Sequence, residues 1–230
     1  MTLGISLVLV GVLTALATDV YDAVIEADGV AGLDRPALDT AISMRSQAGN
    51  RLVGAYTHLG DTPALPIAAT VIAVALAVWW RQWSPIVLIA ITGFGSLALT
   101  IVGKAGVARV RPPIADAVPP FEHSFSFPSG HSLNSVALSG IVAYLLIRWQ
   151  RRRWVRALTV CMAVAYALTI GLSRIYLGAH WLTDVLVAWA LGLAWLTIVI
   201  TAHRLFLTSR RRDARAAADW NGGLQRREPG

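Results

Sequence analysis

Three short groups of polar residues interrupt a largely apolar chain, and their residue types suit the chemistry of a phosphate ester. They are Lys104-x6-Arg111-Pro112, Pro128-Ser129-Gly130-His131, and Ser173-Arg174-x5-His180-x3-Asp184. Together they offer cations for an oxyanion, a helix start on which it can sit, and two imidazoles. One imidazole has a carboxylate four residues on. This set predicts cleavage of a phosphate ester without a metal ion.

The cations stand at the ends of apolar segments, where charge is costly and usually functional. They are Lys104, the only lysine among twenty basic residues, Arg109, Arg111 and Arg174. A charge-assisted hydrogen bond contributes about 1.5–3 kcal/mol, so three such donors could hold one phosphate firmly. Arginine offers a planar fork and lysine a point charge. For Arg109, a side chain that reaches lipid headgroups is an equal alternative.

The second group directly precedes an apolar run and therefore predicts a helix start. Free backbone N–H groups and the positive end of the helix dipole collect there. Gly130 allows an anion to approach the backbone, and Ser129 can cap the helix or donate to an oxygen. His131 would then lie beside the bound phosphate. Taken alone, this tetrapeptide is equally compatible with simple capping.

In the third group, His180 and Asp184 are four residues apart and share one helix face. A carboxylate in this position can hold one imidazole N–H and leave the other nitrogen free to attack. Ser173 and Arg174 precede a short turn that ends in Gly178, which can bring them to the same place. The alternative is a His–Asp pair that only joins two helices.

A metal site is a second alternative, because imidazoles and carboxylates are plentiful near these groups. Its candidate ligands are His123, His131, His180, Asp116, Glu122 and Asp184. A divalent ion would add positive charge where cations already compensate the phosphate, and no paired H-x-x-x-H spacing occurs. We therefore expect no metal and no cofactor.

Composition places these groups in a membrane. The hydrophobic share is 56%, the charged share 14% and the mean hydropathy +0.59, all outside the usage of soluble domains. Six segments have the roughly 17 to 25 apolar residues that a spanning helix needs, at about 3–20, 64–80, 84–103, 131–148, 155–173 and 181–202. The predicted fold is an all-α bundle of about six transmembrane helices.

The distribution of arginines predicts the orientation of this bundle. Arg81, the cluster from Arg148 to Arg156 and the arginines after residue 203 fall on one side of the six-helix path, which should be the cytoplasm. Most acids and all three polar groups fall on the other side. We therefore expect a multi-pass protein of the cell membrane whose site faces away from the cytoplasm.

The predicted organisation is one membrane domain, residues 1–207, followed by a basic cytoplasmic tail, 208–230, whose composition predicts disorder. Within the domain, 21–63 keeps apolar residues at helical spacing and predicts amphipathic helices on the outer surface. An ordinary packed loop is an equal alternative there. Ala15-Leu16-Ala17 resembles a signal-peptide cleavage site, but the start lacks the positive charges of such signals, so we expect it to be retained. Nucleic-acid binding is not expected of a tail tethered in this way.

The eleven fixed positions of the three groups resemble the motifs of the type 2 phosphatidic acid phosphatase superfamily, in order and with the family's internal spacing. The resemblance implies a metal-independent membrane phosphatase in which His180 attacks phosphorus to form a phosphohistidine. Asp184 would orient His180, and His131 would protonate the leaving oxygen. Lys104, Arg111, Ser129, Gly130 and Arg174 would hold the phosphoryl oxygens. Pro112, Pro128 and Ser173 would be supporting residues.

A site at helix ends suits a phosphate whose hydrophobic tail stays in the lipid, so the expected substrate is a lipid phosphate. The family suggests undecaprenyl pyrophosphate, phosphatidylglycerol phosphate or phosphatidic acid. His123 and the segment 21–63 are candidates for selecting headgroup or tail. A transporter or lipid-binding protein that holds phosphate without cleaving it remains the alternative, although two imidazoles are superfluous for holding alone.

Overall fold

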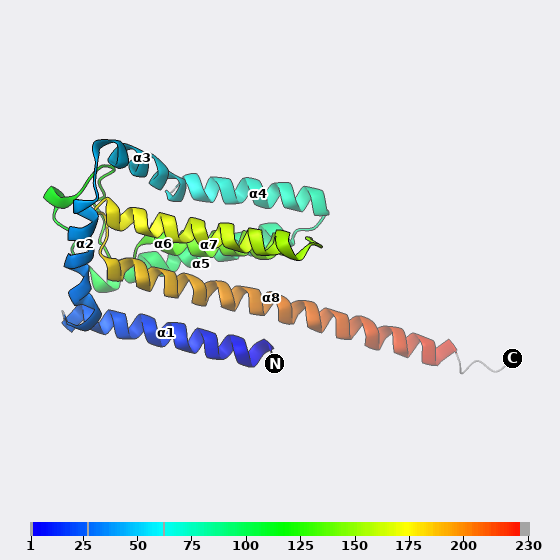
Figure 1. Cartoon of the computed structure of the whole chain (residues 1–230). Helices are drawn as coiled ribbons and strands as arrows, with labels where there is room; N and C mark the ends of the chain where they lie inside the picture. The colour runs from blue at the N-terminus through cyan, green and yellow to red at the C-terminus, as the bar shows by residue number, and fades with distance from the viewer. Residues whose placement is uncertain (1, 27, 62, 226–230) are drawn as a thin grey trace.

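The regular elements of this chain are helices throughout the residues that the computed structural model describes, namely 2–26, 28–61 and 63–225. Six long helices run side by side in a bundle (Figure 1). They are α1 (Thr2–Glu26), α4 (Ala64–Trp80), α5 (Ser84–Val107), α6 (Gly130–Ile147), α7 (Arg153–Tyr176) and α8 (Leu182–Gln225). The predicted all-α fold is confirmed.

Two shorter helices cover one end of this bundle, and three 3-10 turns complete the connections. They are α2 (Asp34–Ser43) and α3 (Gln47–Thr57), with η1 (Gly29–Leu33), η2 (His58–Gly60) and η3 (Ile114–Asp116). In Figure 1, α2 runs across the ends of the long helices, and α3 leads into α4. The predicted helices of segment 21–63 therefore exist, and they lie over the bundle end.

Five helices, α1, α5, α6, α7 and α8, are long and apolar enough to cross a membrane. The sixth, α4, has 17 residues, at the short end of the spanning range. It is bent by 48° from the helix that precedes it, and the pair together also has the length and hydropathy of a span. The expectation of about six spanning helices is confirmed.

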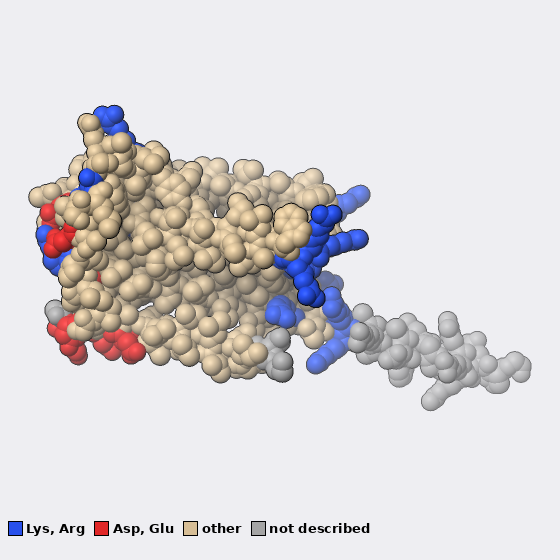
Figure 2. Space-filling view, viewed as in Figure 1, with Lys and Arg blue, Asp and Glu red and all other residues tan. Residues whose placement is uncertain are grey.

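Charged side chains collect at the two ends of the bundle (Figure 2). Acids lie at the end that α2 covers, whereas the opposite end carries a dense group of arginines. Tryptophans mark that second end, where Trp79 and Trp83 are 77% and 79% exposed and Trp80 stacks on Trp149 at 4.9 Å. Arginines and tryptophans together are typical of a membrane boundary, so the protein is a multi-pass membrane protein.

Two elements are longer than the sequence predicts. The helix α1 continues to Glu26, beyond the expected end near residue 20, and Ala17 packs against Phe127 and Val187. The helix α8 continues to Gln225, where composition predicts a disordered tail. Alanine and arginine are strong helix formers, so a stretch rich in both can extend α8. The last five residues, 226–230, lie outside the described part.

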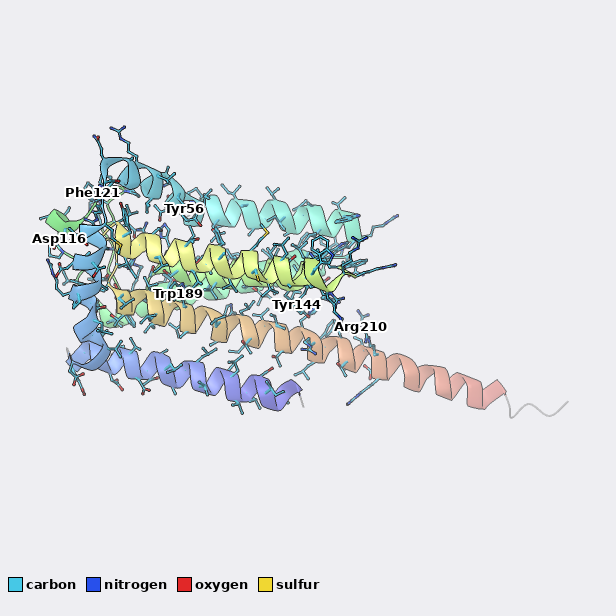
Figure 3. The ribbon with its side chains drawn as sticks, viewed as in Figure 1. Tyr56, Asp116, Phe121, Tyr144, Trp189 and Arg210 are labelled. Atoms are coloured by element: carbon cyan, nitrogen blue, oxygen red, sulfur yellow. The ribbon has the colours of Figure 1, made fainter. Side chains whose placement is uncertain are left out.

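The helix α6 is the most enclosed of the long helices, and it packs against α4, α5, α7 and α8. Trp189 of α8, labelled midway along the bundle in Figure 3, donates from its indole N–H to Ala167 O at 3.2 Å. This packing fixes the start of α6 relative to the neighbouring helix ends. The predicted site residues lie at those ends.

Candidate active site

Four helix ends meet at the end of the bundle that α2 covers. They are the C-termini of α5 and α7 and the N-termini of α6 and α8. The first polar group spans the end of α5, the second opens α6, and the third extends from the end of α7 to the start of α8. The α7–α8 turn needs Gly178, whose φ is +68° and whose missing side chain leaves room for Asp116 O, 2.5 Å from the position of a Cβ. In Figure 3, Asp116 and Phe121 mark the same end.

Glu122, in the loop between α5 and α6, lies at the centre of this meeting point. Its carboxylate accepts a hydrogen bond from Arg111 Nη2 at 2.8 Å and pairs closely with Arg174, and its Oε1 lies 3.6 Å from His131 Nδ1. Burial pushes the pKa of Glu122 up, but the nearby charges, Arg174 first, outweigh it and lower the pKa to about 2. The carboxylate is therefore ionised and lies where two guanidinium groups converge.

His180 is 1% exposed and lies directly beneath Arg111. Its Nε2 is 3.1 Å from Arg111 Nη1, and its Nδ1 is 3.5 Å from Asp184 Oδ2. Since a guanidinium only donates, Nε2 must be the unprotonated nitrogen, and the proton sits on Nδ1 facing Asp184. The 3.5 Å separation is at the long limit of a hydrogen bond.

Burial is the main reason why the pKa of His180 is lowered to about 4. The charge of Arg111 acts in the same direction, and the hydrogen-bonding influence of Asp184 opposes them. The imidazole is therefore neutral at physiological pH, with a lone pair on the nitrogen that Arg111 covers. These are the properties that an attacking nitrogen requires.

Asp184 is fully buried and held by several donors. Arg109 Nη1 donates to its Oδ1 at 2.7 Å, and Oδ2 accepts from the hydroxyl of Ser126 and, at 2.9 Å, from the backbone N–H of Trp181. Arg109 also donates to Asp34 Oδ2 at 2.6 Å. Of the two readings that the sequence leaves open for Arg109, the lipid-facing one is wrong, because this side chain is tied between two buried carboxylates.

A polar cavity of about 380 Å³ opens beside these residues. Its lining includes Asp61, Lys104, Glu122, Gly130, His131 and Asn134. The amine of Lys104 donates to Ser124 Oγ at 3.1 Å and to Phe125 O. The loop 122–125 therefore engages both Lys104 and Arg111. Lys104, Gly130 and His131 all reach a space large enough for a phosphate.

The supporting residues contact the helices around this cavity. Ser129 is fully buried at the start of α6, and its Oγ caps the helix by accepting from the backbone N–H of Ser132 at 3.4 Å. Ser173 Oγ donates to Ile170 O at 2.6 Å. Pro128 packs so closely on α5 that a Cβ at Gly103 would lie 2.5 Å from its ring. Pro112 is buried too.

Three residues that contact the predicted site residues are not predicted from the sequence to belong to the site. Glu122 is considered from the sequence only as a metal ligand, and Thr57 and Asp61 belong to the segment before α4. Thr57 Oγ1 accepts from Arg174 Nη1 at 2.9 Å, and Asp61 contacts His131. The one available signal is the spacing of His58 and Asp61, which are three residues apart and pair.

His123 does not line the polar cavity. Its side chain is exposed and makes no hydrogen bond or ion pair with another described residue. Among the described residues, no group of three or more His, Cys, Asp or Glu side chains is arranged to hold a metal ion.

A multi-pass helical bundle with three cations and two imidazoles at one end, one of them buried and neutral, defines a membrane-embedded site for phosphoryl chemistry. Residues 81–207, more than half of the chain, match the family model of the PAP2 superfamily. This range contains all three polar groups. The chain belongs to the PAP2 superfamily.

Its relatives include phosphatidylglycerophosphatase B of Bacillus subtilis, 32% identical over 74% of this chain and 83% of the relative. An undecaprenyl-diphosphatase of Sulfolobus acidocaldarius is 31% identical over 42% of this chain and 45% of the relative. The crystal structure of the transmembrane PAP2-type phosphatidylglycerolphosphate phosphatase from Bacillus subtilis superposes with a TM-score of 0.75 at 27% identity, covering 86% of this chain and 96% of that one. The protein is a membrane lipid phosphatase.

Proposed function

We propose that the protein hydrolyses a lipid phosphate or diphosphate through a phosphohistidine on His180, without a metal ion, at the extracytoplasmic face of the cell membrane. The observation that carries this proposal is the state of His180. Its Nε2 bears the lone pair, lies 3.1 Å from Arg111 Nη1, and belongs to an imidazole whose pKa is about 4. Arginine beside the attacking nitrogen can hold the phosphoryl group in line for attack.

The remaining residues take roles that follow from their positions. Arg111, Arg174 and Lys104 bind phosphoryl oxygens together with the N-terminus of α6 at Gly130. Asp184 orients His180, and Arg109 in turn orients Asp184. His131 faces the same cavity and exchanges the proton of the leaving oxygen.

A lipid substrate is supported by an apolar groove that adjoins the polar cavity. The groove, about 280 Å³, runs between α4, α5 and α6 and is lined by residues such as Ala69, Ala73, Ala90 and Leu97. Asn134 lines both the groove and the polar cavity. A headgroup beside Lys104 could therefore continue into a hydrocarbon tail that lies along the membrane-facing groove. Candidate substrates are phosphatidylglycerol phosphate, undecaprenyl pyrophosphate and phosphatidic acid.

The reaction class is tested by phosphate release from purified protein in detergent with excess EDTA. We expect undiminished release from lipid mono- or diphosphates, and no release after His180→Ala. Brief reaction with ³²P-labelled substrate followed by an alkaline quench should leave acid-labile, base-stable label on wild type and none on His180→Ala. Turnover by His180→Ala near the wild-type rate would sink the assignment. Activity lost to EDTA and restored by added metal would refute metal independence.

The face of action is tested by labelling single cysteines in intact cells with a membrane-impermeant maleimide. In a Cys161→Ala background, Ile114→Cys reports on the active-site end and Gln82→Cys on the arginine-rich end. We expect Ile114→Cys to react in intact cells and Gln82→Cys only after lysis. The reverse pattern would place the site in the cytoplasm.

The groove is tested by filling it. We expect Ala90→Phe to raise KM for a long-chain lipid phosphate and to leave KM for p-nitrophenyl phosphate unchanged. Ala163→Phe is the matched control, because it adds the same ring to a second apolar groove between α6, α7 and α8. If both substitutions change KM for the long-chain substrate equally, the hydrocarbon tail does not bind in the groove between α4, α5 and α6.

A further inference from the structure

The turn that joins α3 to α4, residues Thr57–Asp61, reaches into the active site although it lies outside the matched range 81–207. Thr57 is fully buried and accepts from Arg174. Gly60 presses against the catalytic end of α6, because an added Cβ there would lie 3.2 Å from His131 Cδ2 and 2.9 Å from Ile170 Cγ2. The turn is therefore built against the ring of His131.

Asp61 joins two imidazoles. Its Oδ1 lies 2.5 Å from His131 Nε2, and its Oδ2 pairs closely with His58 Nδ1. With Nε2 occupied, Nδ1 is the only ring nitrogen of His131 left for substrate. That atom points into the region of Glu122, whose Oε1 is 3.6 Å away. The ring orientation therefore follows from Asp61.

Both positive and negative groups surround His131, and the carboxylate of Asp61 is one of the negative groups. Arg174 on α7 brings positive charge near His131, and Lys104 on α5 lines the same cavity. Glu122 and Asp61 bring negative charge. Glu122, however, occupies the place that a phosphate would take between Arg111 and Arg174. Once a substrate displaces Glu122, Asp61 is the carboxylate that still contacts His131.

The turn is also fixed in place. Tyr166 of α7 donates from its hydroxyl to Leu59 O at 2.8 Å, and Tyr56 is 2.5 Å from Thr169 Oγ1. Burial alone would raise the pKa of Asp61, but hydrogen bonds from His58 and His131 outweigh burial and lower the pKa. Asp61 therefore carries its charge at neutral pH in a defined position.

We propose that Asp61 is a positioning residue for the proton transfer at His131, a role that rests on the proposed function. Asp61 accepts the Nε2–H, directs Nδ1–H at the leaving oxygen and stabilises the imidazolium. When His180 Nε2 bonds to phosphorus and the P–O bond breaks, the Nδ1 proton moves to the leaving oxygen. When water then attacks and the P–N bond breaks, a water proton returns to Nδ1. Asp61 keeps its charge throughout.

The test compares two small substrates of similar size that differ in leaving group. Benzyl phosphate releases an alkoxide, which must be protonated as it leaves, whereas p-nitrophenyl phosphate releases a stable phenolate. Asp61→Asn keeps a hydrogen-bond acceptor and removes the charge. We expect kcat for benzyl phosphate to fall about 10- to 100-fold, part of the ~10²–10⁴ that general acid catalysis supplies, and kcat for p-nitrophenyl phosphate to fall less than about 3-fold.

Two controls separate positioning from simple support of the fold. Thr57→Val removes the neighbouring hydroxyl from Arg174 and should affect both substrates alike. Asp39→Asn removes an exposed carboxylate at the same end of the molecule, one that pairs with Arg35, and should affect neither. Asp61→Glu keeps the charge and should recover part of the benzyl phosphate activity that Asp61→Asn loses.

A double-mutant cycle completes the experiment. In a His131→Ala background, Asp61→Asn should cause no further loss, because its effect passes through that ring. If Asp61→Asn lowers kcat equally for both substrates, or if its effect adds to that of His131→Ala, the proposal for Asp61 is wrong. With His180→Ala inactive, the proposed function would still stand. If instead His180→Ala keeps its turnover, the proposed function has failed.

Discussion

Glu122 pairs with the two guanidinium groups that we assign to substrate phosphate, and this arrangement has a measurable consequence. Its carboxylate accepts from Arg111 at 2.8 Å and pairs with Arg174, and His180 beneath them is only 1% exposed. A phosphoryl group can reach His180 Nε2 only after Glu122 gives up these contacts. Weakening them should therefore tighten the binding of phosphate-like anions.

The magnitude follows from the two contacts. A hydrogen bond to a charged group contributes about 1.5–3 kcal/mol. The Glu122 carboxylate is 25% exposed and regains hydrogen bonds to water when it leaves the two guanidinium groups. We therefore take the net free-energy cost of displacing Glu122 as that of one such bond. Glu122→Gln keeps the shape but replaces a charged acceptor by a neutral one of about half the strength. The expected gain is about 0.75–1.5 kcal/mol, or a fall in inhibition constant of about 3- to 12-fold.

The assay is competitive inhibition of p-nitrophenyl phosphate hydrolysis by orthovanadate, which can mimic five-coordinate phosphorus. Because the pKa of Glu122 is about 2, the carboxylate is charged across the usable pH range and the effect should not depend on pH between 5 and 8. Asp39→Asn is the matched control and should leave the inhibition constant unchanged. A folded Glu122→Gln protein whose inhibition constant is equal or higher would show that Glu122 orients the guanidinium groups and does not compete with phosphate.

Three further predictions concern the charges around His180. Arg109→Ala should lower the free energy of unfolding by about 3–5 kcal/mol, measured by denaturation in detergent, because it leaves the buried carboxylates of Asp34 and Asp184 unpaired. Arg111→Lys should reduce kcat/KM severely in steady-state assays although the charge remains, because the fork that covers His180 is lost. The pKa of His180 is about 4 when folded and near 6.5 when unfolded, so the folded state binds fewer protons and stability should fall as pH drops from 6.5 toward 4. The Tm of His180→Gln should change less with pH across this window than the Tm of the wild type. Equal slopes of Tm against pH would show that His180 does not cause the loss of stability.

The proximity of His180 to Asp184 and the position of the cations at helix ends were predictable because the information is local. The spacing of four residues predicted that His180 and Asp184 are neighbours, and they lie 3.5 Å apart, although His180 belongs to the turn before α8 and the two do not share a helix face. An apolar run that follows Pro128-Ser129-Gly130-His131 indicates where a helix begins. The arginine distribution predicted that these groups share one end of the bundle. The first two inferences need only the chain neighbours of the residue concerned, and the third needs only the order of charged and apolar segments.

Glu122 and Asp61 were not predictable as site residues, because their partners are distant in sequence. Glu122 approaches Arg174 from a loop 52 residues away, and Asp61 approaches His131 across 70 residues. An acid in a polar loop has no feature that distinguishes such a role from ordinary solvation. The His58–Asp61 spacing resembles that of His180 and Asp184, and only the fold shows that Asp61 also contacts His131.

The segment 21–63 was expected to select headgroup or tail, and its contacts favour a different role. It supplies two carboxylates, and each supports one of the two histidines. Asp34 holds Arg109, which holds Asp184 beside His180, and Asp61 holds His131 directly. The range that matches the family contains the histidines, but the charges that set their proton positions come partly from the helices laid over the bundle end. We therefore expect substitutions of Asp34 and Asp61 to change kcat more than KM, because they act on nucleophile orientation and proton transfer and leave the phosphate-binding cations in place.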